Sequence, residues 1–104
     1  MTDLEMTRLC AESMGITYRV HSGSIRIWDT PRPSDGMIVS SKYDPLHDDA
    51  QAMALVKKMD VSVARHGDIW CAVNLHSIAK NADLCRAIVE CVAETQQAKV
   101  KNVA

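Results

Sequence analysis

The stretch ITYRVHSGSIRIW, from Ile16 to Trp28, decides the fold. Residues 16–20 and 24–28 are rich in β-branched and aromatic side chains, which favour strands. Between them, residues 21–23 (HSG) have the composition of a tight turn. The sequence therefore predicts a hairpin of two antiparallel strands.

A second hairpin of the same style is expected farther along the chain. Residues 61–63 (VSV) and 68–73 (DIWCAV) have strand composition, and residues 65–67 (RHG) join them as a turn. We expect residues 37–39 (MIV) to form a short strand or a docked edge. They follow residues 29–36, a predicted loop of turn formers that holds two of the three prolines. Four strands that arrive as hairpins predict a largely antiparallel sheet.

Three segments have helical periodicity. The first covers residues 3–14, after the capping-box pair Thr2 and Glu5, and Gly15 ends it. The second is capped by Asp48 or Asp49 and ends near Met59. The third is predicted to be capped by Asn81 and to run to Gln96. Beyond Gln96 the apolar periodicity is lost, so we expect that end to fray.

The order helix, hairpin, helix, hairpin, helix predicts an α/β (α+β) chain. We expect a three-layer α/β/α sandwich with a mainly antiparallel sheet of about four strands and three helices. A chain of 104 residues has room for one hydrophobic core, so residues 1–104 are expected to form a single domain.

The charge and the N-terminus limit where the protein acts. The net charge is −1, with 12 basic residues spread along the chain, so strong affinity for nucleic acid through the global field is excluded, while a local basic patch stays open. The acidic start MTDLE lacks signal-peptide features, and no apolar run has the length of a membrane span. We therefore expect a cytoplasmic protein of the bacterial host cell, without membrane association.

Catalytic and cofactor motifs are missing from the sequence. There is no nucleophile elbow, phosphate-binding loop or C-x-x-C pair, and the four cysteines fall in apolar stretches typical of buried thiols. His47, Asp48 and Asp49 beside Asp44 could form a hydrolytic or metal site, but a charged helix cap is the favoured interpretation. We predict no enzyme, no cofactor and no metal.

One group of side chains favours a binding surface instead. If Ile25 and Ile27 face the core, Arg26 and Trp28 share the opposite face of the strand, because side chains alternate. The predicted partner interface consists of Arg26, Trp28, Arg32, Lys42 and Tyr43, with Arg19 nearby. For Trp28 an alternative stays open, namely burial as core under a helix on the second face of the sheet.

Three segments also carry a family resemblance. The run YDPLHDDAQAMALV (residues 43–56), followed by WCA (70–72) and LCRAI (84–88), resembles the phage ABA-sandwich domain family of NinX-like small phage and prophage proteins. The resemblance implies a sheet between helical layers and a phage context, and it implies no reaction.

These observations predict a small nonenzymatic phage or prophage protein that binds and modulates a host or phage macromolecule, for instance as an inhibitor of a bacterial defence system. A protein partner is favoured, and the binding of nucleic acid is left open. Two alternatives remain: a module that sequesters a nucleotide signal with arginine side chains on its phosphates, and an accessory protein of phage DNA metabolism. Self-association is also expected, because an uncovered sheet face or strand edge invites a second copy.

Overall fold

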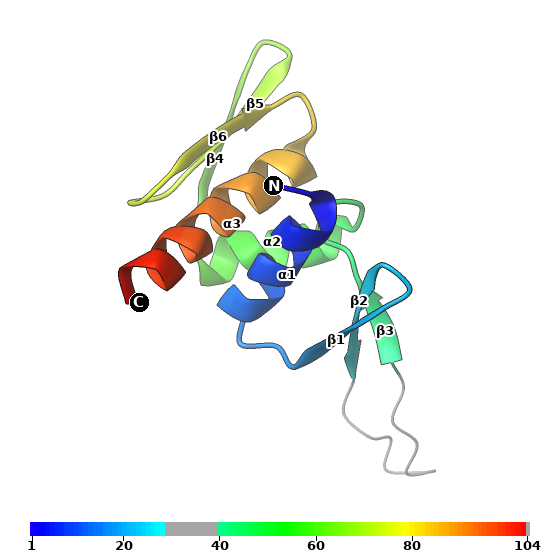
Figure 1. Cartoon of the computed structure of the whole chain (residues 1–104). Helices are drawn as coiled ribbons and strands as arrows, with labels where there is room; N and C mark the ends of the chain where they lie inside the picture. The colour runs from blue at the N-terminus through cyan, green and yellow to red at the C-terminus, as the bar shows by residue number, and fades with distance from the viewer. Residues whose placement is uncertain (29–39, 104) are drawn as a thin grey trace.

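The computed structural model of this chain describes residues 1–28 and 40–103, and Figure 1 shows their arrangement. Three helices and two sets of three strands alternate along it. In chain order they are α1 (Asp3–Ser13), β1 (Tyr18–His21), β2 (Ser24–Trp28), β3 (Ser40–Tyr43), α2 (Asp49–Lys58), β4 (Ser62–His66), β5 (Ile69–Val73), β6 (Ile78–Asn81) and α3 (Leu84–Val103). The expected α+β class, the three helices and both hairpins are confirmed.

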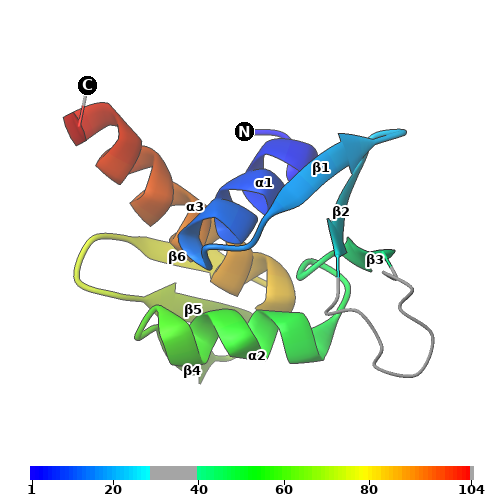
Figure 2. The same cartoon turned by 90° about the horizontal axis from the view of Figure 1, so that it is seen from below.

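The strands form two antiparallel sheets, whereas we expected one. Sheet A has the order β1-β2-β3 and sheet B the order β4-β5-β6. A third strand pairs with each hairpin, β3 in sheet A and β6 in sheet B, and neither of these strands was predicted from the sequence. The strand expected at residues 37–39 lies outside the described residues. Both views place the two sheets far from each other, with sheet A projecting away from the helices (Figures 1 and 2).

Both hairpins close through two-residue turns, one residue tighter than expected. His21 pairs with Ser24, and Ser22 and Gly23 at the turn have φ of 50° and 74°. Positive φ at both central positions matches the twist of the flanking strands, which is why turns of this kind favour Gly. His66 pairs with Ile69 in the second hairpin, whose turn has Gly67 at φ 64°.

Side-chain caps fix the helix starts. The Thr2 hydroxyl accepts a hydrogen bond from the Glu5 amide at 3.1 Å, which confirms the predicted start of this helix with Thr2 as its N-cap. Asp48 caps α2 in the same way, accepting from the Gln51 amide at 3.1 Å. For α3 the prediction of Asn81 was wrong: the Asp83 carboxylate accepts from the Cys85 amide at 3.2 Å, and Asn81 instead accepts from the Asp83 amide at 2.9 Å.

Helix α3 is the centre of the core. It packs against α1, α2, β5 and β6, and its apolar stripe includes Ile88, Val89 and Val92, which are fully buried. Burying one such side chain contributes roughly 1.5–3 kcal/mol to folding. The helix continues to Val103, so the expected fraying beyond Gln96 was wrong. Just before this extension, the buried Thr95 hydroxyl lies 3.1 Å from the Ser77 hydroxyl of the connection between β5 and β6.

Each sheet has one face on this core. In sheet B, Ala72 and Ala79 lie opposite each other and are buried toward α3. In sheet A, Ile25 and Tyr43 lie opposite each other and are buried toward α1. Among residues 1–28 and 40–103, no helix has the length and apolar character that crossing a membrane requires.

Candidate functional site

Three basic residues form a row across sheet A. Arg19 of β1 pairs with Arg26 of β2, and Arg26 pairs with Lys42 of β3. Residues directly opposite on neighbouring strands have Cβ atoms roughly 4.5–5.5 Å apart and lie on the same face. The strands of this sheet (YRVH, SIRIW and SSKY) contain no acidic residue. Three basic side chains on one face of the sheet make this row a candidate site for an anion.

The row lies on the face of sheet A that points away from the core. Its neighbours along the strands, Ile25 and Tyr43, face the opposite way and are buried. Arg19 and Lys42 are exposed and Arg26 is half-buried. The Lys42 ammonium lies 3.9 Å from the Asp44 carboxylate, and an exposed pair at this distance contributes little to stability. The positive charge of Lys42 therefore stays accessible to a partner.

The structure changes the predicted interface residue by residue. It brings Arg26 and Lys42 together and adds Arg19. Tyr43 leaves the interface, because its side chain is only 4% exposed and belongs to the core. Strand alternation explains this correction, since Tyr43 follows the outward-facing Lys42 by one residue. Arg32 lies outside the described residues, and of Trp28 only the backbone pairing with Ser40 is described.

Buried Tyr43 sits in an apolar environment. Its hydroxyl has no hydrogen-bond partner among the described residues. Burial raises the pKa of this phenol above its ordinary value, and the nearby Cys10 raises it further. The ring packs between sheet A and α1, on the face of the sheet opposite to the row of basic residues.

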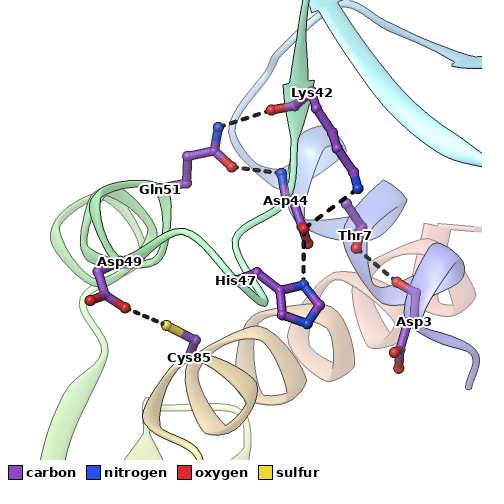
Figure 3. Close-up of polar contacts among 8 residues, drawn as sticks. All are labelled: Asp3, Thr7, Lys42, Asp44, His47, Asp49, Gln51 and Cys85. Carbon is purple, nitrogen blue, oxygen red and sulfur yellow. Dashed lines mark hydrogen bonds and ion pairs between the residues drawn. The ribbon is translucent and has the colours of Figure 1, made fainter.

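The end of β3 is held by the first turn of α2 (Figure 3). The Gln51 side-chain oxygen accepts from the Asp44 amide at 2.6 Å, and its side-chain nitrogen donates to the Lys42 carbonyl at 3.3 Å. Gln51 thus fixes the backbone of Lys42. Sequence reasoning did not single out Gln51, although the D-x-x-Q spacing after Asp48 is that of a capping box and could have drawn attention to it.

The residues around His47 do not converge on a catalytic or metal site. The His47 ring lies 2.9 Å from the Asp44 carboxylate, whereas Asp48 caps α2 and Asp49 accepts from the Cys85 thiol at 3.1 Å (Figure 3). Consecutive residues at a helix start therefore point to three different partners. No group of three or more His, Cys, Asp or Glu in the described part of the chain could hold a metal ion.

A small pocket lies between this turn, sheet A and the start of α1. It has a volume of about 160 Å³, and its lining includes Thr7, Ser24, Lys42, Asp44 and His47. Drug-sized ligands occupy pockets of roughly 300–1,000 Å³, so this hollow admits at most a small group. The His47 side chain is 76% exposed, in contact with water rather than enclosed with a substrate.

Three of the cysteines are protonated, buried thiols. Burial raises the pKa of Cys10 to about 12 and that of Cys85 to about 11, the latter with help from Asp49. Burial also raises the pKa of Cys91. A nucleophilic cysteine needs a lowered pKa and access to solvent, so these three thiols are poor nucleophiles. All four cysteines are free, in accordance with the absence of C-x-x-C spacing.

A second cavity adjoins sheet B, with a volume of about 250 Å³. Lys58, His76 and Lys99 line it together with Asn74 and Thr95. The polar groups of Asn74 and Thr95 bond to each other at 2.9 Å, and the Asn74 oxygen accepts from the His76 and Ser77 amides. These bonds fix the connection between β5 and β6 onto α3.

Comparison with known proteins adds no relative: no family model, no curated protein and no solved structure matches this chain.

Proposed function

We propose that this chain is a nonenzymatic protein that works by binding a macromolecular partner with an anionic surface, through the outer face of sheet A. The single observation that carries the proposal is the cross-strand row Arg19–Arg26–Lys42 on strands without an acidic residue. Guanidinium and ammonium groups gathered on one face of a sheet can donate several charge-assisted hydrogen bonds to the carboxylates or phosphates of one anionic surface.

A binding role also fits the environment of the reactive groups. The thiols of Cys10 and Cys85 have raised pKa values, and the His47–Asp44 pair is open to water beside a pocket of about 160 Å³. A hydrolytic centre needs a nucleophile, a base and stabilising donors around one reacting atom. The described groups point in different directions, which supports surface recognition over catalysis.

In the phage setting that the sequence resemblance implies, such binding would modulate a host or phage macromolecule, for instance a component of a bacterial defence system. The protein would act in the cytoplasm of the host. The alternative of a nucleotide-sequestering module has less support, because the cavities of about 160 and 250 Å³ are smaller than the usual range for ligands.

The test is retention of the protein on an immobilised polyanion such as heparin. One variant carries Arg19→Gln, Arg26→Gln and Lys42→Gln; the matched control carries Lys57→Gln, Lys80→Gln and Lys99→Gln, at three exposed sites elsewhere. Both variants have the same net charge. We expect the wild type and the control to elute at similar salt and the sheet A variant to elute much earlier. Equal elution of the two variants, or no retention of the wild type at low salt, would refute the proposal.

A further inference from the structure

Leu75 is an apolar side chain that lies in water on a fixed turn. It is 97% exposed, in the connection between β5 and β6. The Asn74 side chain holds this connection, since its oxygen accepts from the His76 amide at 2.8 Å and its nitrogen donates to the Thr95 hydroxyl at 2.9 Å. Ordering a flexible loop reduces the affinity for a partner. Because this turn is already fixed, a partner can bury Leu75 at a low cost in entropy.

A cavity that admits a side chain of this size lies directly beside Leu75. It has a volume of about 250 Å³ and is bordered by the end of α2, the β5–β6 connection and α3, with Met59, Leu75 and Thr95 among its lining residues. A cavity of about 150 Å³ is large enough for benzene, and a leucine side chain is smaller than benzene. The cavity can therefore receive one leucine side chain.

The position of Leu75 at this cavity matches a two-fold dimer. In such a dimer the same surface of both copies meets, so each copy gives and receives the same contact. Leu75 lines the cavity and yet lies almost wholly in water, so it stands at the rim. An axis between Leu75 and the cavity carries each leucine into the cavity of the other copy. A second copy of the chain is therefore the occupant that this surface matches.

The charges at the rim are self-complementary as well. Asp60, just after α2, and Lys99 of α3 both line the cavity and are exposed. Neither has an ion-pair partner in the described part of the chain. Lys58, also at the rim, donates to the Met14 carbonyl at 2.9 Å. When two such rims meet, Asp60 of one copy can lie against Lys99 of the other, and a net charge of −1 per chain produces little repulsion.

From these observations we propose that the chain forms a two-fold dimer in which Leu75 of each copy enters the cavity of the other. A contact built on one side chain and one cavity per copy is smaller than the roughly 1,200–2,000 Å² that stable complexes bury, so the dimer is weak and reversible. In both views sheet A and the β5–β6 connection lie on opposite sides of the helices (Figures 1 and 2). The dimer therefore leaves both rows of basic residues accessible, and it offers two of them to an extended anionic partner.

Sedimentation velocity of the full chain, from about 10 μM to about 1 mM, tests the dimer. The wild type should move from the mass of a monomer toward that of a dimer across this range. Leu75→Ala should raise the dissociation constant at least about tenfold, because both copies lose the buried group. Ile69→Ala, at a 47% exposed side chain at the other end of β5, is the matched control and should dimerise like the wild type. An unchanged melting temperature at low concentration shows that Leu75→Ala still folds.

A second measurement locates the leucine within the dimer. In a concentrated mixture of isotope-labelled and unlabelled chains, NMR contacts filtered for pairs between chains should join the Leu75 methyl groups to those of Met59 and Thr95. A monomer at every concentration would overturn the proposal and would leave Leu75 to a different protein. A dimer that Leu75→Ala leaves intact, or one without these contacts, would overturn it as well, because the interface then lies elsewhere. None of these outcomes decides whether sheet A binds an anion.

Discussion

The two sheets have the same plan and different surroundings. Each has three antiparallel strands, with a two-residue turn between the first two. In sheet B the third strand follows the second after residues 74–77, a short connection fixed by the side chain of Asn74, and two strands pack on α3. In sheet A the connection is residues 29–39, and β2 provides the main contact with α1. Sheet B therefore packs on α3 through two strands, whereas sheet A contacts α1 mainly through β2.

The basic residues of the two sheets also have different cross-strand neighbours. Arg65 of sheet B stacks over the Trp70 ring at 5.7 Å and donates to the Gly67 carbonyl at 2.9 Å. A cation held in this way contributes to stability within the protein. In sheet A, three cations lie directly opposite one another. The register therefore gathers basic side chains on one face of sheet A, whereas it sets Arg65 beside an aromatic ring in sheet B.

The largest effect on stability should come from the helix behind sheet B. Ile88→Ala removes a fully buried side chain of α3, the helix that packs against α1, α2 and sheet B. The cavity and the lost burial should lower the free energy of unfolding by about 3 kcal/mol, measured by urea denaturation. Glu94→Ala, at an exposed position of α3, is the control and should change it by less than about 0.5 kcal/mol. A small loss for Ile88→Ala would show that α3 is not the centre of the core.

The connection between β5 and β6 should give the next largest effect. Asn74→Ala leaves the amides of His76 and Ser77 without their acceptor. We expect a loss of about 1–3 kcal/mol in the free energy of unfolding. Leu75→Ala, at a side chain that is 97% exposed, should be nearly neutral. If both variants lose the same amount, the Asn74 network does not anchor sheet B.

The raised pKa of Cys85 predicts a loss of stability in alkali. Burial and Asp49 raise this pKa from the ordinary 9.0 to about 11, so the folded state holds the thiol proton more tightly than the unfolded state. Its contribution is complete below pH 9.0 and is lost as the pH rises to about 11. Urea midpoints measured from pH 8 to 11 should fall less steeply in Cys85→Ala than in the wild type. Parallel curves would contradict this assignment.

The smallest effect belongs to the turn of sheet A. Ser22 has φ 50°, a conformation that Asn adopts at lower cost than Ser. Ser22→Asn should therefore stabilise the protein by about 0.5 kcal/mol, read from the melting temperature. Ser24→Asn, two residues later within β2, should not stabilise it, because strands disfavour Asn. Stabilisation by both changes would argue against the turn as the cause.

Local signals in the sequence predicted much of the fold. The Thr2/Glu5 capping box, the apolar stripe around Ile88 and the HSG turn each depend on residues close together in the chain. The third strands were missed because Ser40–Tyr43 (SSKY) and Ile78–Asn81 (IAKN) lack a run of β-formers and are defined by their partners in the sheet. The division into two sheets depends on long-range packing, which periodicity does not encode.

The candidate site was predicted in part for the same reason. The alternation of side chains along β2 predicted that Arg26 and Ile25 lie on opposite faces of the sheet, and the burial of Ile25 agrees with this. Predicting the row of Arg19, Arg26 and Lys42 also requires the register of β3. This register pairs Lys42 with Arg26 and places Tyr43 on the buried face. A shift of the register by one residue would exchange these two side chains. Register across an eleven-residue connection (29–39) cannot be obtained from the strand sequences alone.

The central claim is that sheet A, and not sheet B, is the working surface. The most direct test is a titration of the isotope-labelled chain with a short heparin oligosaccharide, followed by amide chemical shifts in NMR spectra. We predict that the largest shifts fall on β1, β2 and β3 around Arg19, Arg26 and Lys42, and that they shrink as salt is added. Shifts concentrated on β4, β5 and β6, or no shifts at low salt, would contradict the account.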